Sequence, residues 1–344
     1  MAKIAINGFG RIGRLFFKQA FENPDFQIVA INDLGDAENL AYLLRYDTVY
    51  GVTQGKFKAE VVIEGEKKYF LVRDKKIPFL QEKDSSALPW KELGIDIVVE
   101  STGVYESFEK AKVHLTQGAK RVVITAPAKD EDGAEWKTVL MGVNEGELKT
   151  VVMSSNGSCT TNAASPVIQI MSENPGIEKA ILSTVHGYTA TQSIVDGPVR
   201  GKDLRRGRAA AQNIVPSTTG AAIAVTRAIS SLQGKFDGIS MRVPVVAGSI
   251  ADITFVAKRN TTVEEVNGIF KTAAESPRWK GILKVTEDQI VSSDILGEPY
   301  GAIVDLGFTK VVDGNLVKVL SWYDNEAGYV STLVKHVERV ATLV

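Results

Sequence analysis

The feature that most constrains the fold is a glycine-rich turn directly after the first apolar stretch. Lys3–Asn7 has the pattern of a strand, and Gly8-Phe9-Gly10-Arg11-Ile12-Gly13 follows it and opens a helical pattern. Glycines at these three positions permit a tight turn, close approach of the backbone to a pyrophosphate, and close packing of helix on strand. The sequence therefore predicts a dinucleotide site in which Gly8, Gly10, Gly13 and the helix N-terminus face the diphosphate.

An acidic residue at the end of the next predicted strand indicates which dinucleotide binds. Asp33 stands 20 residues after Gly13 and is followed by Leu34. A carboxylate there can accept hydrogen bonds from the ribose hydroxyls and would repel the additional phosphate of NADP. We therefore predict NAD as the cofactor; the alternative is that the glycines only shape a turn and Asp33 caps a local segment.

The first half of the chain repeats strand and helix. Strand patterns occupy Lys3–Asn7, Gln27–Ile31, Asp96–Glu100, Arg121–Thr125 and Thr150–Ser154. Helical patterns occupy Gly10–Glu22 and Glu106–Gln117. This alternation predicts an α/β domain of the Rossmann type, with a doubly wound parallel sheet.

After about residue 180 the strands become longer and alternate between apolar and polar residues. They are Leu182–Val185, Gly238–Val243, Ala251–Lys258, Ala302–Lys310 and Asn315–Trp322, the last two joined by an Asp313-Gly314 turn. Helical patterns cover Ser217–Leu232, Thr262–Ser276 and Asn325–Val344. We predict an α+β catalytic domain with a largely antiparallel sheet at 158–324, after a cofactor domain at 1–157 that the helix 325–344 completes.

Composition excludes several classes of protein. The 344 residues suffice for two domains, and the formal net charge of -1 gives no general bias toward nucleic acid or membrane. One cysteine and three histidines provide no recognisable metal cluster, so we expect none. With no signal-peptide pattern and no long apolar run, we expect a cytoplasmic protein with no membrane partner.

The only cysteine, Cys159, lies in a polar stretch, Ser155-Asn156-Gly157-Ser158-Cys159-Thr160-Thr161-Asn162, before a helical pattern at Ala163–Ser172. A helix N-terminus lowers the pKa of a thiol and favours the nucleophilic thiolate. The alternative is a buried, inert cysteine. His186, 27 residues further along and at the end of a predicted strand, is a candidate base, whereas we expect His114 and His336 to lie at solvated helix positions.

Basic residues and hydroxyls indicate an anion site. Five cations fall within the ten residues 199–208, Ser217-Thr218-Thr219-Gly220 opens a predicted helix, and Arg242 lies on a strand. Arginines, hydroxyls and helix N-termini bind phosphates, although a charge run is more often a solvated loop.

These segments together resemble the glyceraldehyde-3-phosphate dehydrogenase family over nearly the whole chain. The matching motifs are INGFGRIGR at 6–14, IND at 31–33, VVESTGVY at 98–105, TAPAK at 125–129, SNGSCTTN at 155–162, DLRRGRAAAQNIVPSTTGAA at 203–222, RVPV at 242–245 and SWYDNEAGY at 321–329. The resemblance implies that Cys159 is the nucleophile and His186 its base. It also implies NAD contacts at Arg11, Ile12, Asp33, Lys83, Thr125 and Asn325.

The same resemblance implies two phosphate sites and an assembly. Contacts to the attacking phosphate and the substrate match Ser158, Thr160, Thr219, Gly220 and Arg242. Contacts to the phosphate of the substrate match Thr189, Arg242 and one of the pair Arg205 and Arg206, with Arg206 preferred. The expected assembly is a homotetramer, and the terminal helix is expected to return to the cofactor domain.

The implied reaction is oxidation of glyceraldehyde 3-phosphate to 1,3-bisphosphoglycerate, with NAD and inorganic phosphate, through a thioester on Cys159. One alternative is an erythrose-4-phosphate dehydrogenase, which has the same scaffold and cysteine. The other is a protein that binds RNA or another partner through its basic loop. The near-neutral net charge makes nucleic acid an unexpected main partner.

Overall fold

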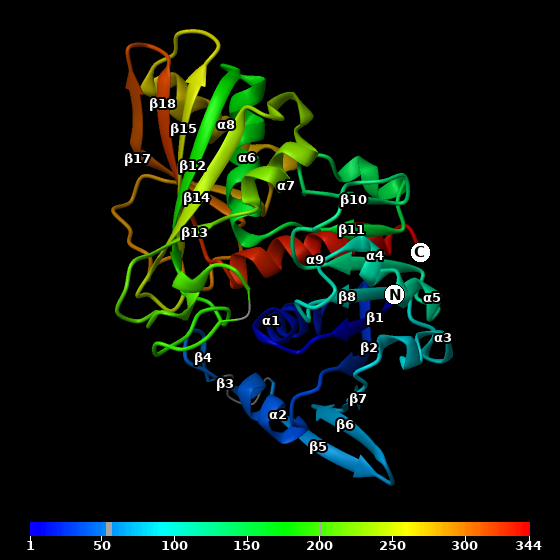
Figure 1. Ribbon diagram of the computed structural model, residues 1–344. Coiled ribbons are helices and arrows are strands. Elements are labelled where there is room, and N and C mark those ends of the chain that lie inside the picture. The colour runs from blue at the N-terminus through cyan, green and yellow to red at the C-terminus, as the bar shows by residue number, and fades with distance from the viewer. Residues whose placement is uncertain (53–56, 200) are drawn as a thin grey trace. The chain divides into compact units, whose positions relative to one another are not determined.

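The computed structural model describes residues 1–52, 57–199 and 201–344 (Figure 1). The chain divides into two compact units. The N-terminal unit comprises Met1–Val139, Glu145–Gly157 and Leu333–Val344, and the C-terminal unit comprises Leu140–Asn144 and Ser158–Thr332. Within these described residues, no helix is long and apolar enough to cross a membrane.

The N-terminal unit is built on a nine-stranded sheet whose central part confirms the predicted doubly wound parallel arrangement. Its strands, in spatial order, are β10 (Trp136–Thr138), β11 (Met153–Ser155), β9 (Arg121–Ile124), β8 (Ile97–Glu100), β1 (Ala2–Asn7), β2 (Phe26–Asn32), β7 (Lys75–Leu80), β6 (Lys67–Val72) and β5 (Ala59–Glu64). All neighbours from β10 to β7 are parallel, whereas β7, β6 and β5 form antiparallel pairs. This antiparallel extension was not predicted from the sequence, and neither was the two-stranded ladder of β3 (Tyr46–Asp47) and β4 (Gly51–Val52).

Helices connect these strands. They are α1 (Arg11–Ala20), α2 (Ala37–Arg45), α3 (Trp90–Leu93), α4 (Phe108–Ala111) and α5 (Val113–Thr116), with short 3₁₀ turns at Ser85–Ala87 and Glu145–Lys149. The single helix predicted at Glu106–Gln117 is wrong, because α4 and α5 are separated at Lys112. Ser107 caps α4 by accepting a hydrogen bond from the backbone N–H of Lys110.

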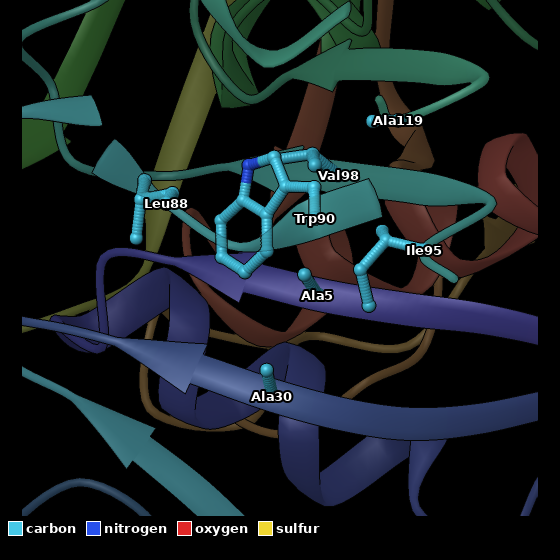
Figure 2. Close-up of a cluster of buried hydrophobic side chains, with 7 residues drawn as sticks. All are labelled: Ala5, Ala30, Leu88, Trp90, Ile95, Val98 and Ala119. Atoms are coloured by element: carbon cyan, nitrogen blue, oxygen red, sulfur yellow. The ribbon is translucent and has the colours of Figure 1, made fainter. Parts of the chain in front are cut away.

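A buried aromatic residue fixes one part of this core. Figure 2 shows the indole of Trp90 above Ala5 of β1 and Ala30 of β2, with Val98 of β8 beside it. All four side chains are fully buried. The alanines on the two central strands leave room for the large ring. Truncating a buried ring of this size to alanine lowers the free energy of unfolding by about 3–5 kcal/mol.

The C-terminal unit contains a seven-stranded mixed sheet with mostly antiparallel neighbours, as predicted. Its spatial order is β13 (Val215–Thr218), β14 (Phe236–Val243), β12 (Ile177–Gly187), β15 (Ser249–Ala257), β18 (Leu316–Tyr323), β17 (Ala302–Val312) and β16 (Leu283–Thr286). The turn between β17 and β18 has positive φ at Asp313 and Gly314, which confirms the predicted hairpin.

Helices of the same unit contact this sheet. They are α6 (Cys159–Glu173), α7 (Ala221–Ala228) and α8 (Val263–Glu275), with 3₁₀ turns at Leu204–Gly207, Ser230–Leu232 and Pro277–Trp279. The prediction of a continuous helix at Ser217–Leu232 is wrong, because Ser217 and Thr218 pair with β14 and the helix begins only at Ala221. The last helix is α9 (Ala327–Ala341), and its residues from Leu333 onward belong to the N-terminal unit.

Candidate active site

The cysteine and the histidine predicted from the sequence lie together in the C-terminal unit. Cys159 is the first residue of α6, and His186 lies near the end of β12. The Sγ atom of Cys159 is 3.3 Å from Nε2 of His186. This is the contact that a nucleophile and its base require.

The other ring nitrogen of His186 determines what this contact can do. Nδ1 lies 2.6 Å from the carbonyl oxygen of Gly187, which can only accept a hydrogen bond. Nη1 of Arg242, which can only donate, is also 2.8 Å from Nδ1, and it lies 3.3 Å from the same carbonyl oxygen. With the arginine hydrogen directed to that carbonyl, Nδ1 keeps the ring proton and Nε2 presents its lone pair to the thiol. In this tautomer His186 is ready to act as a base.

Burial keeps both groups neutral. It lowers the pKa of His186 to about 3, and the guanidinium of Arg242, whose Nη1 is 2.8 Å from Nδ1, acts in the same direction. Burial also raises the pKa of Cys159, while Arg242 and hydrogen bonds from Thr160 oppose that shift. The expectation that the helix terminus leaves Cys159 with a lowered pKa is wrong for this state, because desolvation of the thiolate is the larger effect. Transfer of the thiol proton to His186 is therefore uphill in this environment, since burial disfavours both charged forms, and Nε2 is the basic atom within reach of Sγ, at 3.3 Å.

Tyr323 connects the two elements that carry Cys159 and His186, a role that was not predicted from the sequence. Its hydroxyl is 2.9 Å from Oγ1 of Thr160 on α6 and 2.7 Å from Oγ1 of Thr184 on β12. Its ring packs edge-on against the imidazole of His186, with centroids 5.9 Å apart. The only available signal was its position at the end of an alternating strand, inside the SWYDNEAGY motif.

Two arginines form the centre of a cationic patch near the pair. Burial lowers the pKa of Arg242, and the nearby charge of Arg206 acts in the same direction. Among the described residues, Nε of Arg242 is buried without a hydrogen-bond partner. Nη1 of Arg206 donates to Oγ1 of Thr191, which is 3.0 Å from Oγ1 of Thr189. An anion is the species that such an arrangement accommodates.

The structure separates the two arginines between which the sequence left a choice. Arg205 is exposed and its Nε donates to Asp203, 2.8 Å away. Arg206 contacts Thr191 and its charge acts on both His186 and Arg242. This placement favours Arg206 for the anion. Of the basic run, Arg200 lies outside the described residues.

The hydroxyls predicted to contact phosphate have different surroundings. Ser158 is the N-cap of α6 and forms a capping box with Thr161, so its Oγ is engaged within the helix start. Thr160 is buried against Tyr323. Thr219 accepts a hydrogen bond from the backbone N–H of Ala221, and Gly220 is the N-cap of α7. Ser158 and Thr160 are thus engaged at the start of α6, whereas Thr219 and Gly220 lie at the start of α7, which has no side-chain cap and can receive an anion.

In the N-terminal unit, the glycine turn has the geometry that its sequence requires. Gly8 has a φ of +96°, and a Cβ on it would lie 2.6 Å from the backbone of Ser101 and Thr102. A Cβ on Gly13 would lie 2.1 Å from the carbonyl oxygen of Gly8, whereas Gly10 has open space around it. Because Gly10 is the N-cap of α1 and has no side chain to cap the first turn, the helix start can receive a diphosphate.

The acid predicted to select the cofactor is held beside this turn. Oδ2 of Asp33 accepts the N–H of Phe9 at 2.6 Å, and Oδ1 accepts the N–H of Gly35 at 2.7 Å. Each carboxylate oxygen has a second lone pair for a ribose hydroxyl. These features fit a dinucleotide, with Asp33 at the ribose.

The other residues proposed for the cofactor lie at varied positions. Ile12 is half-buried in the first turn of α1, and the Arg11 side chain pairs with Asp47 at 2.8 Å. Lys83 is exposed after β7. Thr125 directly follows β9, and its backbone N–H donates to the carbonyl oxygen of Glu100. Asn325 lies in the C-terminal unit, where its Oδ1 accepts the N–H of Gly248 at 3.0 Å.

The expectation that His114 and His336 are solvated is wrong. Both side chains are fully buried in the N-terminal unit. His336 lies 2.7 Å from Oγ of Ser154 and 3.1 Å from Oδ1 of Asn156, and His114 contacts Glu100 and Trp90. A histidine can occupy the buried face of a helix when polar partners in the interior satisfy its ring nitrogens. Among the residues that the structure describes, no group of three or more histidines, cysteines or acids could hold a metal ion.

A doubly wound dinucleotide domain and a cysteine–histidine pair define the class: an NAD-dependent oxidoreductase that uses a thiol nucleophile. Residues 2–108 match the family model for the NAD binding domain of glyceraldehyde 3-phosphate dehydrogenase, and residues 158–325 match the model for its C-terminal domain. The chain belongs to the glyceraldehyde-3-phosphate dehydrogenase family.

Curated relatives match over nearly their full length. A glyceraldehyde-3-phosphate dehydrogenase of Thermotoga maritima is 49% identical over 98% of both chains. One from Clostridium pasteurianum is 46% identical over 100% of this chain and 99% of its own. One from Geobacillus stearothermophilus is 47% identical over 95% of this chain and 94% of its own.

Proposed function

We propose that this protein oxidises D-glyceraldehyde 3-phosphate, with NAD and inorganic phosphate, to 1,3-bisphosphoglycerate. The observation that carries the proposal is the 3.3 Å contact between Cys159 Sγ and His186 Nε2. The names of the full-length relatives support the same substrate.

The first chemical task of this pair is to form a thiolate. Nε2 of His186 takes the thiol proton of Cys159, and the sulfur adds to the aldehyde carbon to give a hemithioacetal. The resulting imidazolium can stabilise the oxyanion or return its proton, the usual work of a positioned acid–base. When bound, NAD supplies the hydride acceptor that makes the oxidation to the thioester possible.

The second task is to capture the acyl group with phosphate. Attack of inorganic phosphate on the thioester releases the acyl phosphate and returns the thiolate of Cys159, which recovers its proton from His186. We assign the phosphate groups of substrate and nucleophile to the cationic patch of Arg242 and Arg206, with Thr189, Thr191 and Thr219 as hydroxyl donors. Arg242 supports this assignment, because its Nε is buried without a hydrogen-bond partner among the described residues.

The deciding experiment is an assay of NADH formation with glyceraldehyde 3-phosphate, with and without inorganic phosphate. We expect steady turnover with phosphate and little more than a single turnover without it, because the thioester accumulates. Erythrose 4-phosphate tested in parallel should give a much lower kcat/KM. Phosphate-independent turnover, or a preference for erythrose 4-phosphate, contradicts the proposal.

We further propose that the protein forms a homotetramer. Ile181 of β12 and Ile239 of β14 lie on the same outer face of the C-terminal sheet and are 57% and 51% exposed. Apolar side chains gathered on one exposed sheet face are typical of a protein interface. Sedimentation of the wild type and of Ile239→Lys tests this, since a tetramer through this face should dissociate in the variant.

We also propose a cytoplasmic location. The single cysteine is the nucleophile, and only its reduced thiol can attack an aldehyde. Reducing compartments maintain such thiols. Cell fractionation with a tagged chain tests the location.

A further inference from the structure

A buried carboxylate, Glu100, lies under the glycine turn and has no place in the chemistry above. It ends β8, it is 2% exposed, and its strand pairs with β1, which leads directly into the turn. A buried carboxylate is costly unless donors surround it. The partners of Glu100 therefore show what it does.

Every side-chain contact of Glu100 comes from a donor. Oε1 accepts the backbone N–H of Thr102 at 2.8 Å and its hydroxyl at 2.5 Å. Oε2 accepts Nδ2 of Asn7 at 2.6 Å and faces Nε2 of His114 at 3.0 Å. Both oxygens of the Glu100 carboxyl group are therefore engaged, Oε1 by Thr102 and Oε2 by Asn7 and His114.

Neighbouring residues fix the orientation of the His114 ring and of the Asn7 amide, the two side chains that contact Oε2 of Glu100. Nε1 of Trp90 can only donate, and it is 3.1 Å from Nδ1 of His114, so the proton of a neutral ring lies at Nε2 and points to Glu100. Figure 2 shows Trp90 held within the buried cluster.

A chain of hydrogen bonds fixes the orientation of the Asn32 and Asn7 side-chain amides. The backbone N–H of Glu82 donates to Oδ1 of Asn32 at 2.9 Å, and Nδ2 of Asn32 donates to Oδ1 of Asn7 at 2.8 Å. Nδ2 of Asn7 is then directed to Glu100. The network thus crosses the carboxyl ends of β8, β1 and β2, the edge at which such sheets bind ligands.

Glu100 acts on the turn through one peptide. The Ser101–Thr102 peptide is the surface on which Gly8 packs, because a Cβ on Gly8 would lie 2.6 Å from Ser101 C and from Thr102 N. Oγ of Ser101 also donates to the carbonyl oxygen of Gly8 at 2.7 Å. Glu100 holds the N–H of this same peptide, so its carboxylate sets the position of the backbone beneath the turn.

We propose that Glu100 is a positioning residue for the dinucleotide, which fixes the Ser101–Thr102 peptide and thereby the Gly8–Gly10 turn that receives the diphosphate. The proposal rests on the NAD dependence of the proposed function, but not on its substrate. It applies to binding of any ligand that carries the adenosine diphosphate group.

The test is calorimetric titration of the purified full-length protein with NAD and with ADP-ribose, which lacks the nicotinamide. Glu100→Gln keeps the shape of the side chain but replaces one carboxylate oxygen with an NH₂ group, which then faces groups that donate hydrogen bonds themselves. We expect the Kd to rise about tenfold for both ligands, the effect of losing one charge-assisted hydrogen bond. Alkylation of Cys159 by iodoacetamide in the absence of NAD should stay within about twofold of wild type, because the C-terminal unit is untouched.

Asp96→Asn is the matched control. Asp96 precedes the same strand at its other end, where it accepts the backbone N–H of Lys3 at 2.8 Å. This variant should bind both ligands as the wild type does, even if its melting temperature falls. Equal weakening in Asp96→Asn and Glu100→Gln would overturn the proposal, since loss of strand stability alone would then explain it.

Thr102→Val covers the case in which Glu100→Gln does not fold. It removes one of the two bonds from Thr102 to the carboxylate and should raise the Kd by a few fold. An unchanged Kd in Thr102→Val or in folded Glu100→Gln overturns the proposal, as does a wild type that does not bind NAD. A wild type that binds NAD but does not oxidise glyceraldehyde 3-phosphate contradicts only the proposed function.

Discussion

Nε2 of His186 faces the Sγ atom of Cys159 at 3.3 Å, while the opposite ring nitrogen is held 2.6 Å from the carbonyl oxygen of Gly187. The backbone therefore presents the imidazole to the thiol in the tautomer that can accept a proton. Burial disfavours both the thiolate of Cys159 and the imidazolium of His186. Proton transfer between the two side chains therefore depends on the direct contact of Sγ with Nε2.

Replacing His186 with asparagine should lower kcat by roughly 10²- to 10⁴-fold, the usual contribution of a positioned acid–base. Asparagine cannot take the thiol proton, so alkylation of Cys159 by iodoacetamide at neutral pH should slow as well. Cys159→Ser serves as the control without a thiol and should lose essentially all activity while still binding NAD. Wild-type alkylation kinetics in His186→Asn would show that the two side chains do not exchange a proton.

Replacing Tyr323 with phenylalanine should loosen the same pair without removing either member. The change removes the hydroxyl that joins Thr160 to Thr184 and leaves two buried hydroxyls to find other partners. We expect a loss of about 1–3 kcal/mol in the free energy of unfolding and a reduced kcat. Denaturant unfolding and initial rates measure both, and Thr184→Val, which removes one of the two bonds, should show a smaller effect of the same kind.

Much of this organisation could be predicted from sequence because it depends on local patterns. A strand, a glycine turn and an acid at the next strand end indicate a dinucleotide fold, since few other structures require glycine at those positions. The helix predicted at Ala163–Ser172 is present, but α6 begins earlier, at Cys159, so the cysteine is the first residue of the helix rather than a residue before it.

The rest depends on partners that sequence does not bring together. His114 looked like a surface residue of an amphipathic helix, but Glu100 and Trp90 satisfy its ring in the interior. The pKa of Cys159 was expected to fall because the helix dipole is readable from sequence, whereas the depth of burial that raises it is not. Ser217 and Thr218 were assigned to a helix although they pair with β14, a tertiary contact that overrides local preference.

The buried histidines make stability depend on pH. Burial lowers the pKa of His336, as of His186, to about 3, whereas an unfolded histidine titrates near 6.5. Below 6.5 the unfolded chain binds protons that the folded chain does not, so stability is complete above about pH 6.5 and is lost as the pH falls toward 3. Each histidine contributes a slope of up to about 1.4 kcal/mol per pH unit in this window.

Replacing His336 with glutamine should therefore make the free energy of unfolding less dependent on pH. We expect the decrease in unfolding free energy between pH 7 and pH 5 to be smaller than in the wild type by about 2 kcal/mol. Urea unfolding at several pH values measures this difference. A variant with the wild-type slope would mean that folding does not lower the pKa of His336.

Replacing Asp33 with serine should change the choice of cofactor. The carboxylate accepts the N–H groups of Phe9 and Gly35, which direct it beside the glycine turn, where it can bind the ribose hydroxyls of NAD and repel the 2′-phosphate of NADP. Each charge-assisted hydrogen bond to a hydroxyl is worth about 1.5–3 kcal/mol, so kcat/KM with NAD should fall at least tenfold, while the value with NADP should rise or hold.

The preference should not invert fully, because Leu34 is exposed beside Asp33 and offers no cation to the additional phosphate. Saturation curves with each cofactor, for the wild type and for Asp33→Ser, measure the ratio. Asp36→Asn is the matched control, since Asp36 is an exposed acid that caps α2 through the N–H of Asn39 and should leave the ratio unchanged. If the wild type uses both cofactors equally, or if Asp33→Ser leaves their ratio as it was, then Asp33 does not contact the ribose and the turn binds its ligand in another register.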